Sequence, residues 1–361
     1  MRCLIANDKF KGSLSALEAA KAIAAGLPSG TVVDLCPIAD GGDGFTETML
    51  AALEGRRVQA TVSDALGRPI VATYGVTAGG LAVLEMAAAS GLVAITPGDR
   101  SILRSSTFGT GELIRDAANQ PDVRRIVIGL GGSATNDGGV GMASALGFQP
   151  QDGQGRPLDP WPGAWNDLAG FRPSEAPLLP NISVASDVTN PLLGPNGATA
   201  VFAKQKGATA TEREQLERAL RRLVQVTGAM EVANRPGAGA AGGLGFGLMH
   251  FLDAALHSGF ELVAETLHLE QRIEQADIVI TGEGSMDAQS LDGKGPIGVA
   301  RMAAKANRPV YALAGRITAE VRATNLFHAT QGLDESGLRM ADLMQNAAQL
   351  LTEATRRLIP T

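Results

Sequence analysis

The chain has 361 residues, which is enough for about two domains with large buried cores. With 45% apolar and 19% charged residues it is too hydrophobic for a disordered chain, and its net charge of −6 and 4% aromatic content argue against a nucleic-acid surface. Its two cysteines cannot build a disulfide framework and no leader sequence is recognisable. We therefore expect a soluble, cytoplasmic protein with no nucleic-acid or membrane partner.

Apolar runs alternate with amphipathic stretches, which is typical of α/β proteins with a parallel sheet. Near the two ends of the chain, strands are predicted at residues 3–6, 31–35, 277–281, 310–314 and 326–329. Helices are predicted at residues 14–27, 296–305 and 341–358. Ser15 and Glu18 predict a capping box for the first of them. Two strands plus three give the count of a five-stranded flavodoxin-like domain, built from residues 1–56 and 275–361.

Residues 57–274 are expected to form an inserted α/β domain, which makes the first domain discontinuous. Its predicted strands lie at residues 57–62, 70–76, 81–86, 125–128 and 182–185. Its predicted helices lie at residues 109–119, 139–146, 211–226 and 244–256. Residues 150–180 are rich in Gly, Pro and Trp and are predicted to be a long loop. Residues 76–96 could span a bilayer by length, but the central Glu85 favours a buried strand followed by a loop.

The expected sheet order also predicts that both cysteines are free thiols. Cys3 opens the first strand and Cys36 follows the second. If the two strands are parallel neighbours, the cysteines lie at opposite ends of them, roughly 13 Å apart. That separation exceeds the ~7 Å between Cα atoms that a disulfide can bridge.

Five of the predicted strands or apolar runs are followed by a short polar or glycine-rich loop that carries Asp or Glu. These loops are residues 7–13, 40–44, 131–139, 186–191 and 281–287. Ligands of open α/β sheets bind beyond the carboxyl ends of the strands. A single acidic loop can be a solvated turn, but five of them together predict one site.

The loop at residues 131–139 suits phosphate, because small residues let backbone N–H groups approach an anion and a helix follows. The alternative is a turn packed closely on a neighbouring segment. Lys11 and Lys294 are the nearest cations and could reach phosphate or be ordinary surface lysines. Residues 237–242 match G-x-G-x-x-G, but no convincing strand precedes them, so a turn before a helix is the preferred interpretation.

Histidine and cysteine are absent from these five loops, so a zinc site is improbable. Clustered carboxylate oxygens suit Mg²⁺, which is usually carried into a site on phosphates. The residues alone therefore predict Mg²⁺-dependent phosphate chemistry on a small polar substrate, and they do not name the substrate.

The same loops resemble the motifs of the type-1 glycerate kinase family. The matching segments are residues 7–16, 39–44, 85–92, 131–139, 186–192, 237–243, 281–284 and 287–290. They follow one another in order over nearly the whole chain. The resemblance implies two α/β domains and transfer of the ATP γ-phosphate to D-glycerate, usually at O2, which gives 2-phosphoglycerate. One departure is Asn-Asp-Lys-Phe at residues 7–10, where the family usually has Pro-Asp-Ser-Phe.

Roles for individual residues follow from that resemblance and from the needs of phosphoryl transfer, in which a protein mainly positions groups and neutralises charge. The residues expected to hold the ATP phosphates are Gly131, Gly132, Ser133 and Lys294. Those expected to bind glycerate are Lys11, Ser13, Asn136 and Asp137. Glu283 and Asp287 would bind Mg²⁺. Asp187 is the first choice of general base for the C2 hydroxyl, with Asp8 and Asp40 as alternatives.

Two other functions stay open at this point. One is a kinase for another small hydroxy acid, such as tartronate or hydroxypyruvate. The other is a nucleotide-binding regulatory protein without turnover, which the clustered carboxylates disfavour because binding alone gains little from them. We expect a monomer or a homodimer.

Overall fold

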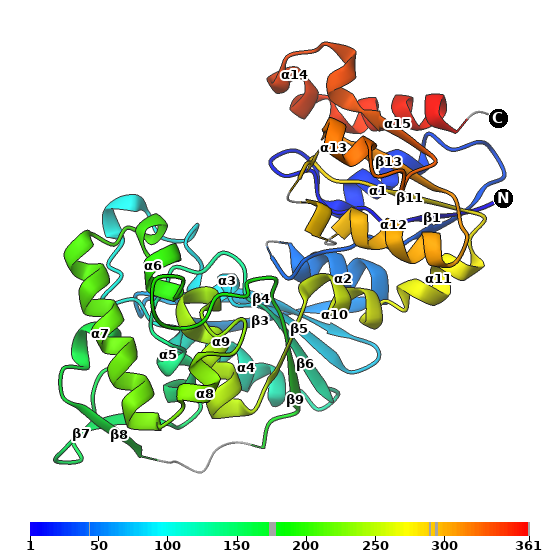
Figure 1. Cartoon of the computed structure of the whole chain (residues 1–361). Helices are drawn as coiled ribbons and strands as arrows, with labels where there is room; N and C mark the ends of the chain where they lie inside the picture. Colours follow the sequence, from blue (N-terminus) through cyan, green and yellow to red (C-terminus); the bar gives the residue numbers. More distant parts are fainter. Residues whose placement is uncertain (43, 173–177, 289, 293–294, 360–361) are drawn as a thin grey trace. The chain divides into compact units, whose positions relative to one another are not determined.

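The computed structural model describes residues 1–42, 44–172, 178–288, 290–292 and 295–359 (Figure 1). The chain divides into two compact units. Unit 1 comprises Met1–Asp40, Glu47–Glu54 and Gly259–Thr361, and unit 2 comprises Gly41–Thr46 and Gly55–Ser258. Residues 259–274, which the sequence analysis assigns to the insert, lie in unit 1, where they form two helices.

Unit 1 contains a five-stranded sheet in which every neighbouring pair is parallel. In spatial order the strands are β15 (Ala329–Gly332), β13 (Val310–Ala314), β11 (Ile278–Thr281), β1 (Arg2–Ile5) and β2 (Val32–Leu35). In sequence order this is the arrangement 2-1-3-4-5 of flavodoxin-like domains. The structure therefore confirms the predicted α/β class and the five-strand count.

Helices cover both faces of this sheet (Figure 1). The helices of unit 1 are α1 (Ala16–Ala24), α2 (Phe45–Leu53), α10 (Gly259–Thr266), α11 (Leu269–Gln275), α12 (Gly295–Lys305), α13 (Ala319–Arg322), α14 (Met340–Gln345) and α15 (Ala347–Leu358). Short elements complete the unit: β12 (Ser285–Met286), β14 (Arg316–Ile317) and the 3-10 turns Ser290–Asp292 and Leu333–Ser336. Ile5 and Leu313 pack toward α1 and α15, whereas Ala312 and Ala314 pack toward α12. Successive strand residues thus feed two cores, as expected of a sheet buried on both sides.

The last strand begins later than predicted. Residues 326–329 were expected as the strand, but β15 runs from Ala329 to Gly332. Leu326 and Phe327 pack instead against the small core that contains Ile317 and Val321. Their apolar character therefore reflects packing in the preceding loop.

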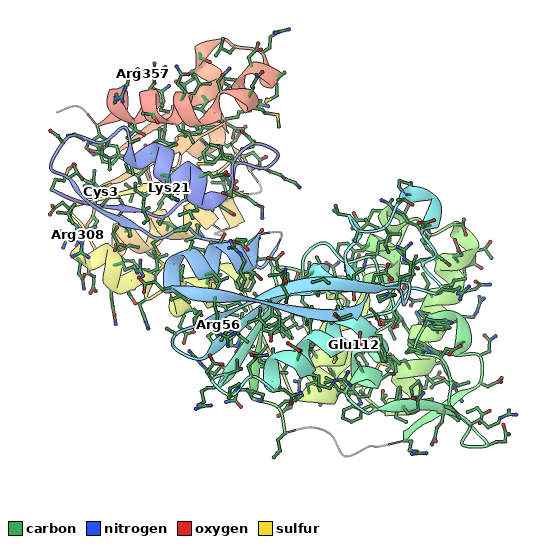
Figure 2. The ribbon with its side chains drawn as sticks, turned by 180° about the vertical axis from the view of Figure 1, so that it is seen from behind. Cys3, Lys21, Arg56, Glu112, Arg308 and Arg357 are labelled. Carbon is green, nitrogen blue, oxygen red and sulfur yellow. The ribbon has the colours of Figure 1, made fainter. Side chains whose placement is uncertain are left out.

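The register of β1 and β2 keeps the two cysteines apart. Cys3, on β1 (Figure 2), pairs with Val33, whereas the N–H of Cys36 donates to Ile5 O at the opposite end. Both thiols are free and buried, and burial raises their pKa values to about 12 for Cys3 and about 11 for Cys36.

We expect neither thiol to react with a thiol-specific reagent in the folded protein at pH 8, because the reactive thiolate is almost absent. Two equivalents should react once the chain is unfolded without reductant. No reactive thiol after unfolding would reveal a Cys3–Cys36 disulfide and contradict the sheet order.

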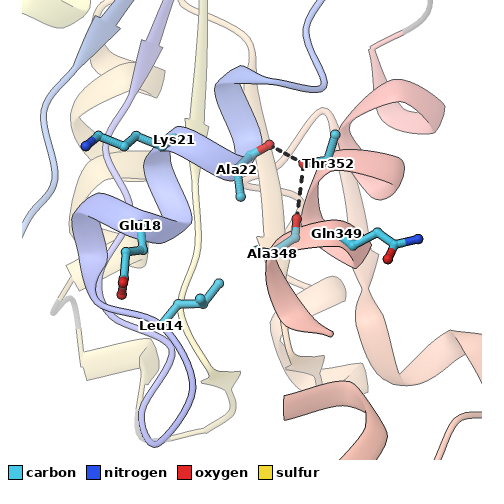
Figure 3. Close-up of a pocket in the computed structure, with 7 residues that line it drawn as sticks. All are labelled: Leu14, Glu18, Lys21, Ala22, Ala348, Gln349 and Thr352. Carbon is cyan, nitrogen blue, oxygen red and sulfur yellow. Dashed lines mark hydrogen bonds between the residues drawn. The ribbon is translucent and has the colours of Figure 1, made fainter. Parts of the chain in front are cut away.

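Helices α1 and α15 pack side by side, and Figure 3 shows this contact. Thr352 Oγ1 donates to Ala22 O across the contact at 2.8 Å and lies 3.1 Å from Ala348 O within α15. The predicted capping box of α1 is present: Ser15 Oγ accepts from the N–H of Glu18, and Glu18 accepts from the N–H of Ser15. An open groove with Glu18 and Lys21 on its wall lies beside the contact.

Unit 2 contains a six-stranded mixed sheet. In spatial order the strands are β10 (Ala255–His257), β9 (Asn181–Ala185), β6 (Arg125–Gly129), β5 (Leu81–Glu85), β4 (Pro69–Thr77) and β3 (Gly55–Ser63). The first four are parallel, and β3, β4 and β5 pair antiparallel. The helices are α3 (Ala87–Ser90), α4 (Phe108–Ala118), α5 (Val140–Ala145), α6 (Ala198–Phe202), α7 (Ala210–Thr227), α8 (Met230–Ala233) and α9 (Ala240–Leu252), with 3-10 turns at Pro97–Asp99, Pro162–Ala164 and Lys204–Lys206. Glu112 lies on α4 (Figure 2), and its Oε2 accepts from the N–H of Ser63 over 2.7 Å, which connects α4 with the end of β3.

Three strands of unit 2 depart from the sequence prediction. Residues 150–180, expected as a loop, contain most of an antiparallel pair, β7 (Gln149–Asp152) and β8 (Leu168–Arg172). The Pro and Gly residues of this segment hide the strand pattern in the sequence. In the structure, Phe171 packs on Phe251, and this contact holds β8 in place. The sequence prediction also lacks β10, whose three residues are too few to show a pattern.

No helix among the described residues has both the length and the apolar character needed to cross a membrane. The apolar stretch at residues 76–96 contains the end of β4, all of β5 and the short helix α3. Glu85, at the end of β5, accepts from the N–H groups of Thr46 at 2.8 Å and Gly44 at 3.3 Å.

Candidate active site

The four parallel strands of unit 2 end in register at one edge of the sheet. Glu85 on β5 pairs with Gly129 on β6, Gly129 pairs with Ala185 on β9, and Ala185 pairs with His257 on β10. The loops that follow these strands therefore leave from the same edge, which is where ligands of parallel sheets bind. The candidates in this unit are Gly131, Gly132, Ser133, Asn136, Asp137 and Asp187.

The glycine-rich loop after β6 has an accessible part and a buried part. Gly132 is exposed and Gly131 and Ser133 are half-buried, whereas residues 134–139 are buried. The N–H of Gly131 donates to Gly41 O over 3.3 Å. Within the described part of the chain, the N–H groups of Gly132 and Ser133 have no acceptor. Two adjacent N–H groups of this kind can bind an anion.

The buried part of the loop is held by Asp137. Its carboxylate accepts from the N–H and hydroxyl of Thr107, at 2.7 and 2.8 Å, and from the N–H groups of Gly139 and Gly141, both at 3.1 Å. Burial raises the pKa of Asp137, and these hydrogen bonds oppose the shift. The N–H groups at the start of α5 thus bind this carboxylate and are not offered to a phosphate.

Asn136 is also fully buried, and its Nδ2 donates to Thr199 Oγ1 over 3.0 Å. Glycerate binding by Asn136 and Asp137 stays a prediction. Their contacts support a different role, which is to fix the shape of the loop.

The glycine pattern at residues 237–242 supports the same loop by close packing. Gly242 has a φ of +69°, and a Cβ there would lie 2.0 Å from Thr135 O. Its carbonyl accepts from the N–H of Gly138 over 3.1 Å. Non-helical dihedral angles at Ala241, Gly242 and Gly243 mark a turn before the regular part of α9, which agrees with the preferred interpretation of this pattern.

A cation that the sequence analysis missed lies against the glycine-rich loop. Lys206 is only 3% exposed, and its Nζ donates to Ser133 Oγ at 2.6 Å and to Thr135 O at 2.7 Å. Burial lowers the pKa of Lys206 to about 7, and the negative charge of Asp137 opposes this shift. Lys204, two residues earlier, is exposed. The sequence contains both lysines and carries no signal that says which one is buried.

Asp187 lies in the loop after β9 and is half-buried. Its Oδ1 accepts from Ser258 Oγ over 3.1 Å, and Ser258 directly follows β10. Asp187 therefore comes from the strand next to β6, at the same sheet edge as the glycine-rich loop. Ser258 is a second residue that sequence reasoning missed, because β10 was not predicted.

The unit 1 candidates also gather at the carboxyl ends of parallel strands. They are Asp8, Lys11, Ser13, Asp40, Glu283 and Asp287. The N–H of Asp8, after β1, donates to Gly282 O, after β11, over 2.8 Å. Gly282 is required here, because a Cβ would lie 1.6 Å from Leu313 O on the neighbouring strand.

The acidic residues of unit 1 influence one another's pKa values. Burial raises the pKa of Glu283 to about 7, and the charges of Asp8, Asp287 and Asp40 reinforce this, while the hydrogen bond from Ser290 opposes it. Burial also raises the pKa of Asp8 to about 6; Asp40 adds to that shift and Lys9 opposes it. Repulsion between carboxylates of this kind is relieved by a bound cation.

The donor set of unit 1 fits Mg²⁺ in one of its usual binding modes. Ser290 Oγ donates to Glu283 Oε1 at 2.8 Å and accepts from the N–H of Asp287 at 3.2 Å, which links the two predicted ligands. Among the described residues, no group of three or more His, Cys, Asp or Glu side chains is placed to hold a metal ion. Mg²⁺ commonly takes one or two carboxylates and completes its shell with water and substrate phosphates, so two carboxylates suffice.

The two lysines and the serine that were predicted to bind ligands in unit 1 differ in their surroundings. Lys11 is exposed, and its backbone lies next to Gly284 in the loop after β11. Ser13 Oγ donates to Met344 O over 2.7 Å, so this contact anchors the loop after β1 to α14. Lys294, predicted to reach the ATP phosphates, lies outside the described residues.

The raised pKa of Glu283 predicts a pH-dependent stability. A carboxyl group with a higher pKa in the folded state binds its proton more tightly there, so its contribution to the free energy of unfolding falls as the pH rises from about 4.5 through about 7. In Glu283→Gln this loss should disappear, leaving the variant more stable than wild type at pH 8 by on the order of 3 kcal/mol.

Urea unfolding at pH 4.5 and pH 8 without divalent cations measures the effect, with the exposed Glu270→Gln on α11 as control. If wild type and Glu283→Gln differ in free energy of unfolding by the same amount at both pH values, Glu283 ionises normally. Adding Mg²⁺ should stabilise wild type more than Glu283→Gln.

Comparisons with known proteins show which family the chain belongs to. A sequence profile described as "Glycerate kinase family" matches residues 3–361. Glycerate kinase of Bacillus subtilis is 41% identical, over 99% of this chain and 96% of that protein, and glycerate 2-kinase of Escherichia coli is 43% identical, over 89% and 87%. A crystal structure provisionally assigned as glycerate kinase 2, from Salmonella typhimurium LT2, is 40% identical with a TM-score of 0.88 and covers 99% of this chain and 96% of its own. The chain is thus an enzyme of the kinase class. It belongs to the glycerate kinase family.

Proposed function

We propose that this enzyme transfers the γ-phosphate of ATP to O2 of D-glycerate with the help of Mg²⁺, which gives ADP and 2-phosphoglycerate. The observation that carries the proposal is the pair of N–H groups at Gly132 and Ser133, accessible at the sheet edge that also presents Asp187. Family membership supports the kinase chemistry, and one relative is a glycerate 2-kinase.

The accessible part of the glycine-rich loop would bind ATP. The N–H groups of Gly132 and Ser133 and the Ser133 hydroxyl would donate to phosphate oxygens. Lys294 would add a positive charge. Glu283 and Asp287 would hold Mg²⁺ through carboxylate oxygens. A bound Mg²⁺ would neutralise charge that develops on the phosphate oxygens during transfer.

Asp187 would act as general base toward D-glycerate. It takes the proton of the C2 hydroxyl, the O2 oxygen forms a bond to the γ-phosphorus, and the bond from that phosphorus to the bridging oxygen of ADP breaks. The hydrogen bond from Ser258 orients the Asp187 carboxylate for this proton transfer. Lys11, which is exposed, would bind the glycerate carboxylate. Asp8, whose pKa burial raises to about 6, is the alternative base, and Asp40 is the next.

ADP release coupled to NADH oxidation tests the proposal. The purified protein should release ADP with D-glycerate, ATP and Mg²⁺, at a kcat/KM well above that for tartronate or hydroxypyruvate. Faster turnover of another hydroxy acid would identify a different acceptor. ATP binding without release of ADP in the presence of any of these acids would instead indicate a regulatory protein.

A further inference from the structure

Lys206 is held in its buried position by its own segment. It ends the 3-10 turn Lys204–Lys206, and its neighbours Ala203 and Ala208 pack in a small core with Ile102 and Leu216. An ammonium group removed from water is costly unless hydrogen bonds replace its hydration. Lys206 finds these bonds on the glycine-rich loop, at Ser133 Oγ and Thr135 O.

The direction of the hydrogen bond to Ser133 determines what that hydroxyl can do. Lys206 Nζ donates to Ser133 Oγ, and in its protonated form the amino group can only donate, so Ser133 Oγ is the acceptor. The hydroxyl proton must then point to another acceptor, and no described residue supplies one. Ser133 is half-buried and its neighbour Gly132 is exposed, so the proton can reach a ligand.

We propose that Lys206 is a positioning residue for phosphate binding: it holds Ser133 so that the hydroxyl and the adjacent N–H groups of Gly132 and Ser133 are presented together to the phosphate chain of ATP. This inference rests on the proposed function of the loop. A second contact from the same segment, between Asn136 and Thr199 on α6, fixes the buried part of the loop. Lys206 acts through Ser133 and does not itself touch the substrate.

Steady-state kinetics of three variants test this role. Lys206→Met keeps the length of the side chain and removes the charge, and it should raise the KM for ATP by roughly tenfold to a hundredfold, which is the effect of losing a charged hydrogen bond. The KM for D-glycerate should change less than threefold. Lys206→Arg, which keeps the charge, should recover part of the loss. Lys204→Met, at the exposed lysine of the same turn, is the matched control and should behave as wild type.

A double-mutant cycle separates positioning from a general structural effect. Ser133→Ala should raise the KM for ATP in the wild-type background, but by less than twofold in the Lys206→Met background, because the two residues act as one unit. If Ser133→Ala raises the KM for ATP by the same factor in both backgrounds, the two residues act independently and the proposal is wrong. A Lys206→Met variant that lowers only the melting temperature, or one that raises the KM for D-glycerate in place of that for ATP, would also overturn the proposal.

Two further measurements keep the test decisive. If Lys206→Met does not fold, Ser133→Ala alone must still raise the KM for ATP, since it retains the bond from Lys206 to Thr135 O; an unchanged KM would overturn the proposal. Calorimetric binding of inorganic tripolyphosphate needs no turnover. If the wild-type protein does not phosphorylate D-glycerate, the proposed function is wrong. Weaker binding of tripolyphosphate by Lys206→Met than by wild type would still support the role of Lys206. Equal binding by the two proteins would contradict that role.

Discussion

Asp187→Asn is expected to lower kcat by roughly 10²- to 10⁴-fold, which is the usual contribution of a general base. The amide has nearly the shape of the carboxylate and can still accept from Ser258, so the loop after β9 should keep its structure. It cannot take the proton of the C2 hydroxyl. The KM for ATP should stay within about threefold of wild type, because the phosphate-binding groups belong to another loop.

Two variants complete this experiment. Ser258→Ala removes one hydroxyl that donates to Asp187 and leaves the carboxylate itself, so its kcat should fall far less than that of Asp187→Asn. Asp8→Asn tests the alternative base. An Asp187→Asn variant with nearly wild-type kcat would rule out Asp187, and a large loss in Asp8→Asn would then assign the proton transfer to Asp8.

Asp137→Ala should lower the free energy of unfolding by about 3–5 kcal/mol, since a buried charge with several partners is removed. The substitution leaves the Thr107 hydroxyl and three backbone N–H groups without their acceptor. It also removes the negative charge near Lys206. Urea unfolding measures the loss. Asp167→Ala, at an exposed carboxylate of the same unit, should change stability by less than about 0.5 kcal/mol.

The same variant tests the sequence-based role of Asp137. If Asp137 binds glycerate, Asp137→Ala should remain nearly as stable as wild type while its KM for D-glycerate rises strongly. That outcome would contradict the structural role derived from its four hydrogen bonds.

Local signals were sufficient to predict much of the fold. Val310–Ala314 is a continuous apolar run bounded by Pro309 and Gly315, and β13 has the bounds of this run. Ser15 and Glu18 specify a helix start through their own hydrogen bonds, which need no distant partner. For the sheet of unit 1, the sequence predicted the number of strands but not which strands are neighbours. No local signal determines that β11 lies next to β1.

The candidate site shows where sequence reasoning stops. Asp137 and Asp187 both follow buried strands and look equivalent in the sequence, yet one is fully buried by Thr107 and the start of α5, and the other stays half-buried beside Ser258. Lys204 and Lys206 differ in the same way. Burial of a polar side chain depends on which distant segment packs over it, and the sequence does not encode that segment locally.

Phosphorus NMR of the reaction mixture tests the central claim most directly. With D-glycerate, ATP and Mg²⁺, the proton-coupled spectrum should show ADP together with a new phosphomonoester signal split into a doublet, because a phosphate on O2 is coupled to the single C2 proton. A triplet would place the phosphate on O3, where two protons couple to it. Inorganic phosphate alone, or ATP that stays intact, would show that this member of the family does not phosphorylate glycerate.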